Sequence, residues 1–203
     1  MTGVLHRFPD VLRRLRARYA EPHRAYHGQA HVDTMLRGFA AARGEFAAPD
    51  AAELAIWFHD AVYDPAARDN EARSAVLLVS ELSGLLDPGL LEAAALLIRL
   101  TADHTVPRGL PPAVAADAAI LLDLDMAILG APAAEFDAYE RGIEAEYRPV
   151  HGAERFRAGR RQFLLATLAR PRLFLTDKAH GRLDATARAN IRRALAALGG
   201  KSS

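Results

Sequence analysis

The residues of this sequence most suited to chemistry are the adjacent His59 and Asp60, which stand inside the apolar run LAIWFHDAVY from Leu54 to Tyr63. A helix that is apolar all round is buried. An ionised Asp in such a helix is costly unless it is paired or bound to a metal ion. A metal ion that takes the adjacent His as a second ligand is one physical answer. A buried hydrogen bond from a His or an Arg is the other, and the segment alone leaves both open.

A second segment, YHGQAHV, carries two further imidazoles. His27 and His31 are spaced i, i+4, so on one helix they would share a face. Gly28 lies between them and can place His27 just outside the helix. Either His taken alone is more simply explained as a core or surface residue. His31 becomes a candidate metal ligand only in combination with the adjacent pair His59 and Asp60, called the doublet below.

A third segment, ILLDLDMAILG, places two acids among apolar residues. Asp125 falls on the apolar stripe that Leu121 and Ile128 define at helical spacing, and this stripe should face the core. Asp123 lies on a less continuous row and is more plausible as an acid near the helix end that faces solvent. We therefore expect Asp125 to point inward.

The elements that must position these residues are helices. Ala and Leu, which favour helices, outnumber the β-branched residues that favour strands. Apolar residues recur at helical spacing along nearly the whole chain, and Pro and Gly mark the breaks. The third helix is expected to end before Pro65. Helices are predicted over residues 4–20, 29–43, 50–62, 69–84, 88–102, 112–129, 132–147, 150–169 and 184–198, with a short turn over 172–181. The sequence thus predicts an all-α bundle of about eight to nine helices, forming a single domain over 1–198 with a disordered tail at 199–203.

Composition excludes several classes of protein. The 203 residues include no Cys, which rules out disulfides and thiolate metal sites. A formal net charge of +1 argues against a dedicated nucleic-acid binder. No segment resembles a membrane span or a secretory signal, so a cytoplasmic location is expected.

In combination, His31, the His59-Asp60 doublet and Asp125 resemble the HD superfamily of metal-dependent phosphohydrolases, which has a His, a His-Asp doublet and a distant Asp on different helices. The interval from His31 to the doublet and the longer interval from Asp60 to Asp125 are both typical of the family. The flanking segments YHGQAHV, AIWFHDAVYDP, DNEARSA and DLDMAILGAP look like those of a small single-domain subfamily, and the resemblance covers about residues 12–195.

The resemblance implies an HD-like fold and a divalent metal ion held by His31, His59, Asp60 and Asp125. Such a set leaves positions open for water, as a catalytic site requires. Nitrogen and oxygen ligands suit Mn, Fe, Co, Ni, Zn or Mg and do not select among them. The implied reaction is hydrolysis of a phosphomonoester or phosphodiester by a metal-activated water. Nucleotides are among the candidate substrates.

Further residues are assigned roles around this centre. Asp60, Glu71 and Asp64 are the predicted catalytic carboxylates, the last two as proton donor or as acceptors for the ligands. The candidates for contact with the substrate or with the ligands are His27, His104, Arg73 and Asp123. Other phosphate-binding candidates are Arg99 and the trio Arg157, Arg160 and Arg161, which would share one helix face.

Other functions remain open at this point. An HD-fold di-iron oxygenase would need about six ligand side chains, more than the four firm ones here. After the phosphohydrolase and the oxygenase, the third hypothesis is a non-catalytic domain that binds metal or a nucleotide. The expected partner is a small phosphorylated molecule; a homodimer is left open, whereas a membrane or nucleic acid is not expected.

Overall fold

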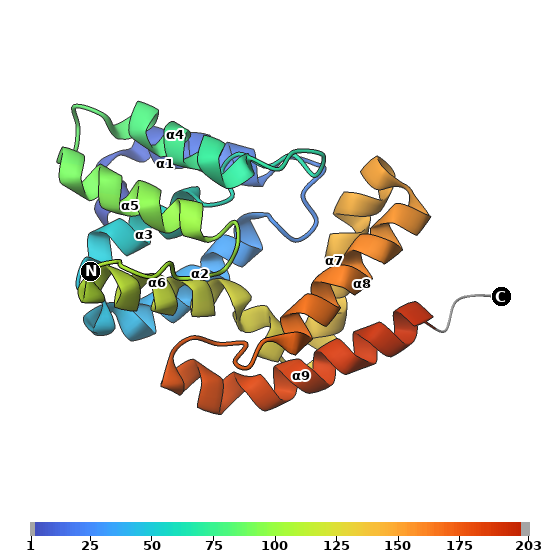
Figure 1. Cartoon of the computed structure of the whole chain (residues 1–203). Coiled ribbons are helices and arrows are strands. Elements are labelled where there is room, and N and C mark those ends of the chain that lie inside the picture. The colour runs from blue at the N-terminus through green and yellow to red at the C-terminus, as the bar shows by residue number, and fades with distance from the viewer. Residues whose placement is uncertain (1–2, 200–203) are drawn as a thin grey trace. The chain divides into compact units, whose positions relative to one another are not determined.

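The computed structural model describes residues 3–199, and regular structure there is helical apart from one isolated β-bridge between Ser83 and Leu86 (Figure 1). The helices are α1 (Pro9–Tyr19), α2 (Gln29–Ala42), α3 (Pro49–Phe58), α4 (Asn70–Leu82), α5 (Pro88–Leu100), α6 (Pro112–Asp125), α7 (Ala133–His151), α8 (Ala153–Ala169) and α9 (Asp177–Gly199). Short 3-10 segments are η1 (Val4–Arg7), η2 (Arg43–Glu45) and η3 (Met126–Gly130). The predicted all-α class is confirmed.

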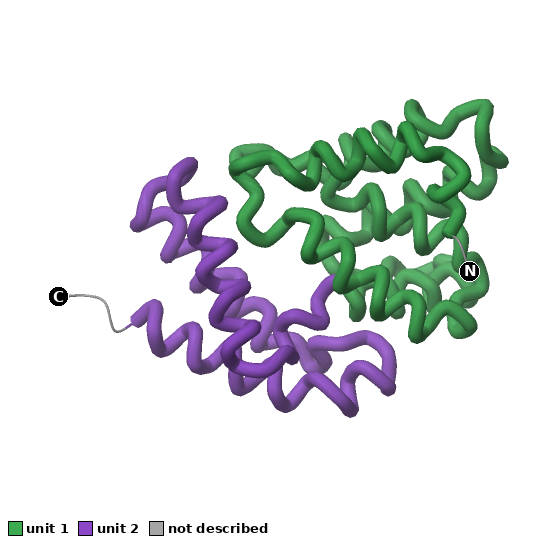
Figure 2. Tube along the Cα trace, turned by 180° about the vertical axis from the view of Figure 1, so that it is seen from behind, with its two compact units in different colours: residues 1–124 green, residues 125–203 purple. Residues whose placement is uncertain are grey.

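Internal contacts divide the chain into two compact units, residues 1–124 and 125–203 (Figure 2), with the boundary at the last residue of α6. The assignment of residues 1–198 to a single domain stays a prediction. In the predicted tail, Gly199 is the last residue of α9, and positions 200–203 lie outside the described residues.

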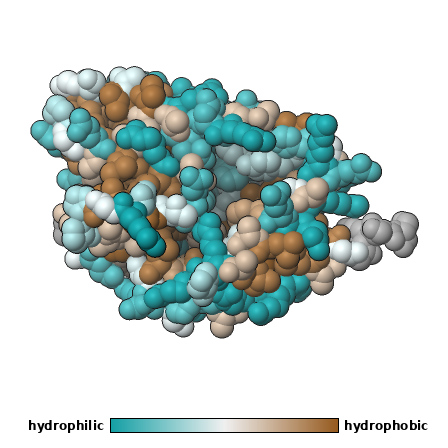
Figure 3. Space-filling view, viewed as in Figure 1, coloured by the Kyte–Doolittle hydropathy of each residue, from teal (hydrophilic) through white to brown (hydrophobic). Residues whose placement is uncertain are grey.

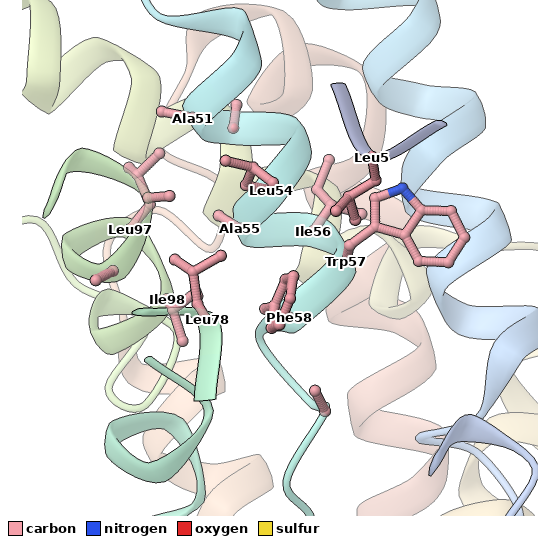
Figure 4. Packing of buried hydrophobic residues seen from close by; sticks show 14 of the residues in the cluster. Leu5, Ala51, Leu54, Ala55, Ile56, Trp57, Phe58, Leu78, Leu97 and Ile98 are labelled. Atoms are coloured by element: carbon pink, nitrogen blue, oxygen red, sulfur yellow. The ribbon is translucent and has the colours of Figure 1, made fainter. Parts of the chain in front are cut away.

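Helix α3 is the central element of the first unit, where it packs against η1, α2, α4 and α5. Pro49 occupies its first turn, where a missing N–H costs no hydrogen bond. All residues from Ala51 to Phe58 are buried, and Figure 4 shows Leu54 and Phe58 in the same cluster as Ile98 of α5. Burying one such large apolar side chain stabilises the fold by about 1.5–3 kcal/mol. This core holds the C-terminal end of α3, and with it the following residue His59, in place.

The start of α3 is tied to α6. Asp117, which is 3% exposed, accepts hydrogen bonds from the backbone N–H groups of Ala47 and Ala48, each at 2.8 Å. Ala47 and Ala48 directly precede α3, whose first N–H groups have no partner within the helix, so a carboxylate beside that end is stabilising. The Asp117 side chain therefore caps α3 from a different helix, a role that the sequence analysis did not foresee.

The second unit consists of η3 and α7–α9, with contacts between α7 and α8, between α8 and α9, and between η3 and α9. Buried Asn190 of α9 donates to the carbonyl oxygens of Leu129 and Ala131 and so holds the chain on either side of the end of η3. Arg188 donates to the carbonyl oxygen of Leu168 in the last turn of α8 and to those of Arg170 and Pro171 in the α8–α9 connection. Polar side chains thus secure irregular backbone.

Two predicted helix boundaries in the first unit are wrong. The helix predicted over 4–20 consists of η1 followed by α1, because Pro9 fixes its own backbone angle and starts a helix more readily than it continues one. The helix predicted over 50–62 ends at Phe58, well before Pro65. It stops there because the N–H of Val62 is bound by the Ser74 hydroxyl.

The last helix is longer than predicted. Helix α9 begins at Asp177 rather than at 184, within the segment that was expected to form a turn. The hydroxyl of Thr176 accepts a hydrogen bond from the N–H of Ala179 at 3.1 Å and so caps the helix. Helix α7 also extends past its predicted end and contains Pro149 in its last turn.

Candidate metal centre

His31, His59 and Asp125 form the one group of metal-ligating side chains found within the described residues 3–199. Each residue offers one ligand atom, and these atoms lie within 4.8 Å of one another. His31 stands in the first turn of α2, His59 directly follows α3, and Asp125 is the last residue of α6. The two imidazoles are buried and the carboxylate is half-buried. All three residues were predicted as metal ligands.

The ring of His59 is held in one orientation. Its Nδ1 lies 2.9 Å from the carbonyl oxygen of Ile56, which can only accept, so Nδ1 carries the proton. The other ring nitrogen, Nε2, then presents the lone pair of the neutral imidazole. A hydrogen bond of this kind from the far nitrogen is common for His residues that ligate metals.

Asp60 lies beside both imidazoles. Its Oδ2 lies 3.0 Å from Nε2 of His59 and 3.8 Å from Nε2 of His31. Burial acts to raise the pKa of this carboxyl, but the positive charge that His59, His27 and His31 carry when protonated outweighs it and holds the pKa well below its usual range. Asp60 is therefore ionised at neutral pH.

The donor atoms of this cluster fit a bound cation. Nε2 of His31 and Nε2 of His59 lie 3.2 Å apart, and both face the carboxylate of Asp60. With the His59 proton on Nδ1, lone pairs of nitrogen and oxygen converge in a buried space, which is unfavourable unless a proton or a metal ion lies among them. Imidazole nitrogen and carboxylate oxygen are ligands that divalent metal ions accept.

The two acids near the end of α6 differ from expectation in burial. Asp125 belongs to the group of metal-ligating side chains, as expected. Asp123, for which a position facing solvent was favoured, is only 6% exposed. That expectation is wrong because α6 is surrounded more completely than its apolar stripe indicated: Asp117 and Leu122, which lie off the stripe, are buried as well.

His27 lies outside α2, which begins at Gln29. Its ring stacks on that of Tyr63 at a centroid distance of 4.5 Å and stands 6.3 Å from the ring of His31. The ring of Tyr26 lies 4.9 Å from that of His31. Of the two histidines spaced i, i+4, His31 belongs to the group that could hold a metal ion, and His27 is an aromatic neighbour of that group.

Glu71 and His104 are electrostatically connected to the cluster. Burial raises the pKa of Glu71, and the negative charge of Asp60 raises it further, while His104 and His59 act in the opposite sense. His104 follows α5 with a positive φ, a left-handed backbone that His adopts more readily than most residues. Both residues were predicted near the site; Glu71 lies within electrostatic range of Asp60 and His59, and His104 lies within range of Glu71.

Side chains of α4 hold the loop that follows the doublet. The hydroxyl of Ser74 accepts from the N–H of Val62 at 3.0 Å. The amide of buried Asn70 pairs with Asp64, accepting from its N–H at 3.1 Å and donating to its carbonyl at 2.9 Å. The DNEARSA segment thus supplies backbone anchors for this loop. Sequence reasoning missed both residues, because hydrogen bonds to irregular backbone leave no periodic signal.

The side chains of Asp64 and Arg73 each contact a residue close to them in the sequence. The carboxylate of Asp64 is exposed and accepts from the N–H of Ala66 at 2.8 Å. This bond closes a turn. The guanidinium of Arg73 is half-exposed and lies 3.9 Å from the carboxylate of Asp69. The catalytic role of Asp64 and the substrate-binding role of Arg73 stay predictions.

The three α8 arginines that were predicted to share a face do not share one environment. Arg160 is buried, forms an ion pair with Glu140, and packs over the rings of Tyr139 and Phe163. Arg157 and Arg161 are exposed. The prediction of a common arginine face is wrong for Arg160, because stacking on aromatic rings and pairing with a carboxylate draw it into the second unit.

Arg24 is the most extensively bonded polar side chain near the cluster, and sequence reasoning did not single it out. Its side chain is 0% exposed and donates to the carbonyl oxygens of His27, Asp60 and Ala61. It lies in the connection between α1 and α2, where no apolar period exists to draw attention to one arginine.

No family model matches this chain, and no match was found among curated proteins or solved structures. Within the described residues, no helix has both the length and the apolar character needed to cross a membrane. On the face drawn in Figure 3, apolar residues are interrupted by hydrophilic ones. The chain therefore presents an all-helical fold with a buried His/His/Asp cluster that could bind a metal ion.

Proposed function

We propose that this protein is a metal-dependent phosphohydrolase of the HD type. The observation that carries the proposal is the convergence of His31, His59 and Asp125, with Asp60 Oδ2 3.0 Å from His59 Nε2. The order of these residues along the chain and their flanking segments resemble the HD superfamily, and the all-helical fold agrees with that family. In this proposal all four residues ligate one divalent ion.

When bound, a divalent ion at this place supplies a hydroxide nucleophile near neutral pH and polarises a phosphoryl oxygen. The chain's own residues prepare that chemistry. The Nδ1 hydrogen bond to Ile56 keeps the Nε2 lone pair of His59 available. The depressed pKa of Asp60 keeps its carboxylate ionised as a ligand, so that binding requires no proton loss from this group.

Glu71 is the proposed proton donor to the leaving group. Its half-buried carboxyl has a raised pKa, because burial and the nearby charge of Asp60 disfavour the ionised form. A raised pKa keeps the proton on a carboxyl group over a wider range of pH, as a proton donor requires. His104 and His27 are the proposed contacts for the phosphorylated substrate, for which nucleotides remain candidates.

The first experiment measures metal content by elemental analysis on protein purified without a chelator or a His-tag. Wild type should carry one equivalent of a transition metal, or take one up when Mn²⁺, Co²⁺ or Ni²⁺ is added. Asp125→Asn should lose it while keeping its helix content. Asp123→Asn is the matched control, because it removes a buried carboxylate from the same helix and should retain the metal.

The metal identified in this way is then used in a screen of phosphomonoesters, phosphodiesters and nucleotides. Hydrolysis that requires the ion and is lost in Glu71→Gln, with metal content unchanged, would support the proposal. Two equivalents of iron would favour a di-iron oxygenase instead. Absence of metal from wild type, with none taken up on addition, would refute the proposal.

A further inference from the structure

We infer that Arg24 is a positioning residue for the candidate metal centre: its guanidinium joins the backbone before His31 to the backbone of the His59-Asp60 doublet. Nη1 donates to the carbonyl oxygen of His27 at 2.9 Å and to that of Asp60 at 2.6 Å. Nη2 donates to the carbonyl oxygen of Ala61 at 3.3 Å. One side chain thus links the two segments that carry the clustered imidazoles.

The guanidinium is itself held in place from several sides. Its carbon lies 5.2 Å from the ring centre of Tyr19 and 5.3 Å from that of Tyr63. Its Nε donates to the carboxylate of Glu21 at 3.1 Å. Because the Arg24 side chain is fully buried, its rotamer is set by packing as well as by hydrogen bonds. A guanidinium held in this way fixes the positions of the carbonyl groups to which it donates.

The planar arrangement of the guanidinium N–H donors, and not the positive charge alone, is what holds the two segments together in this inference. Arginine offers five N–H donors in a rigid plane, so one side chain can bind several carbonyl groups whose positions are fixed relative to one another. Lysine keeps the positive charge but has three donors on one atom and cannot stack in the same manner. Arg24→Lys therefore separates geometry from charge.

The inference rests on the proposed function insofar as it concerns metal binding, and two readouts keep it independent. The first is the affinity for Co²⁺ alone, followed by visible absorption and calorimetry. The second is amide hydrogen exchange of residues 60–63 in metal-free protein. Arg24→Gln and Arg24→Lys should each weaken Co²⁺ binding by roughly tenfold to a hundredfold, as loss of groups that orient ligands does. Both should also speed amide exchange of residues 60–63.

Arg188→Gln is the matched control. Arg188 also donates to three backbone carbonyl oxygens and to a carboxylate, that of Asp184, but the segment that it holds carries no member of the metal-ligating group. Its variant should lose thermal stability and keep Co²⁺ affinity within about twofold of wild type. Equal loss of affinity in Arg24→Gln and Arg188→Gln would reduce Arg24 to a general structural role and overturn the inference.

Recovery of full affinity in Arg24→Lys would also overturn it, since charge alone would then suffice. Should Arg24→Gln not fold, Tyr63→Leu removes one face of the guanidinium stack and should weaken binding about threefold, the equivalent of one cation–π contact. If wild type binds no metal, the proposed function fails. The exchange rates at 60–63 then decide separately whether Arg24 holds the backbone of the doublet: unchanged rates in Arg24→Lys contradict this, and faster rates support it.

Discussion

Replacement of Asp117 by Ala tests the capping of α3 from α6. The carboxylate accepts two hydrogen bonds of 2.8 Å from the N–H groups of Ala47 and Ala48, so Asp117→Ala removes both. A hydrogen bond to a charged group contributes about 1.5–3 kcal/mol. Ala47 is exposed, so water can replace part of the loss, and the net destabilisation should be about 2–4 kcal/mol.

The assay is urea unfolding followed by far-UV circular dichroism, together with thermal melting. For a chain of this length a loss of about 2–4 kcal/mol lowers Tm by about 5–15 °C. Asp117→Asn should lose about half as much, because its amide oxygen still accepts one bond while its NH₂ group cannot. The expected order of stability is wild type, then Asn, then Ala.

Asp50→Asn is the control for simple charge near the helix start. Asp50 lies in the first turn of α3 but is exposed and pairs with Arg43 at the surface. Such a charge near a helix N-terminus is worth about 0.3–1 kcal/mol. A loss below about 1 kcal/mol in Asp117→Ala, or a loss equal to that of Asp50→Asn, would refute the argument that the two hydrogen bonds of Asp117 stabilise the start of α3.

Three further outcomes are expected. Burial acts to raise the pKa of Asp184, but hydrogen bonds from the backbone N–H of Leu173 and from Arg188 outweigh it, so the pKa in the folded protein is lowered. This carboxylate therefore stabilises the fold at pH values above its ordinary pKa, and the stabilisation is lost as the pH falls through the lowered pKa of the folded state. Asp184→Asn should therefore be less stable than wild type by about 1 kcal/mol in urea at pH 7, with the gap closing below pH 4; a gap that does not depend on pH would contradict this. Gly130→Ala should lower the stability by about 1–3 kcal/mol, because the added Cβ would stand 2.7 Å from Cβ of Leu183. Gly159→Ala, inside α8 with nothing within 4 Å, should raise it by about 0.8–1 kcal/mol, and a shift of the same sign for both glycines would be evidence against the steric argument. Addition of the bound metal at about a hundred times its Kd should stabilise the protein by about 2.7 kcal/mol, seen as a concentration-dependent rise in Tm that a chelator reverses; a Tm indifferent to metal would count against a site present in the folded state.

The class of fold could be predicted because each helix carries its own signal. The Pro residues at positions 49, 88 and 112 stand at the starts of α3, α5 and α6, where the sequence placed them. Of the boundaries that failed, the end of α3 is the one set by a side chain from elsewhere in the chain. Ser74 takes the N–H of Val62 and prevents α3 from continuing, and no local pattern could have indicated this.

The members of the candidate metal cluster could be predicted for a different reason. His59 and Asp125 are polar residues on otherwise apolar stretches, and burial of such residues requires compensation that the sequence makes conspicuous. The residues that hold the cluster in place are not conspicuous. Arg24 and Asn70 lie at or near loops, and their partners are backbone groups, which every sequence possesses in equal measure.

The packing of α3 has a consequence for the order of events during biosynthesis. Leu54, Ile56 and Phe58 are fully buried by apolar neighbours, so the helix that presents His59 is held by contacts that do not involve the candidate ligands. In zinc fingers, by contrast, the chain stays unfolded until the ion binds. Here the nascent chain should reach its helical fold first, so that any metal ion at the candidate centre would bind to an already folded protein and would depend on which ions the cell supplies.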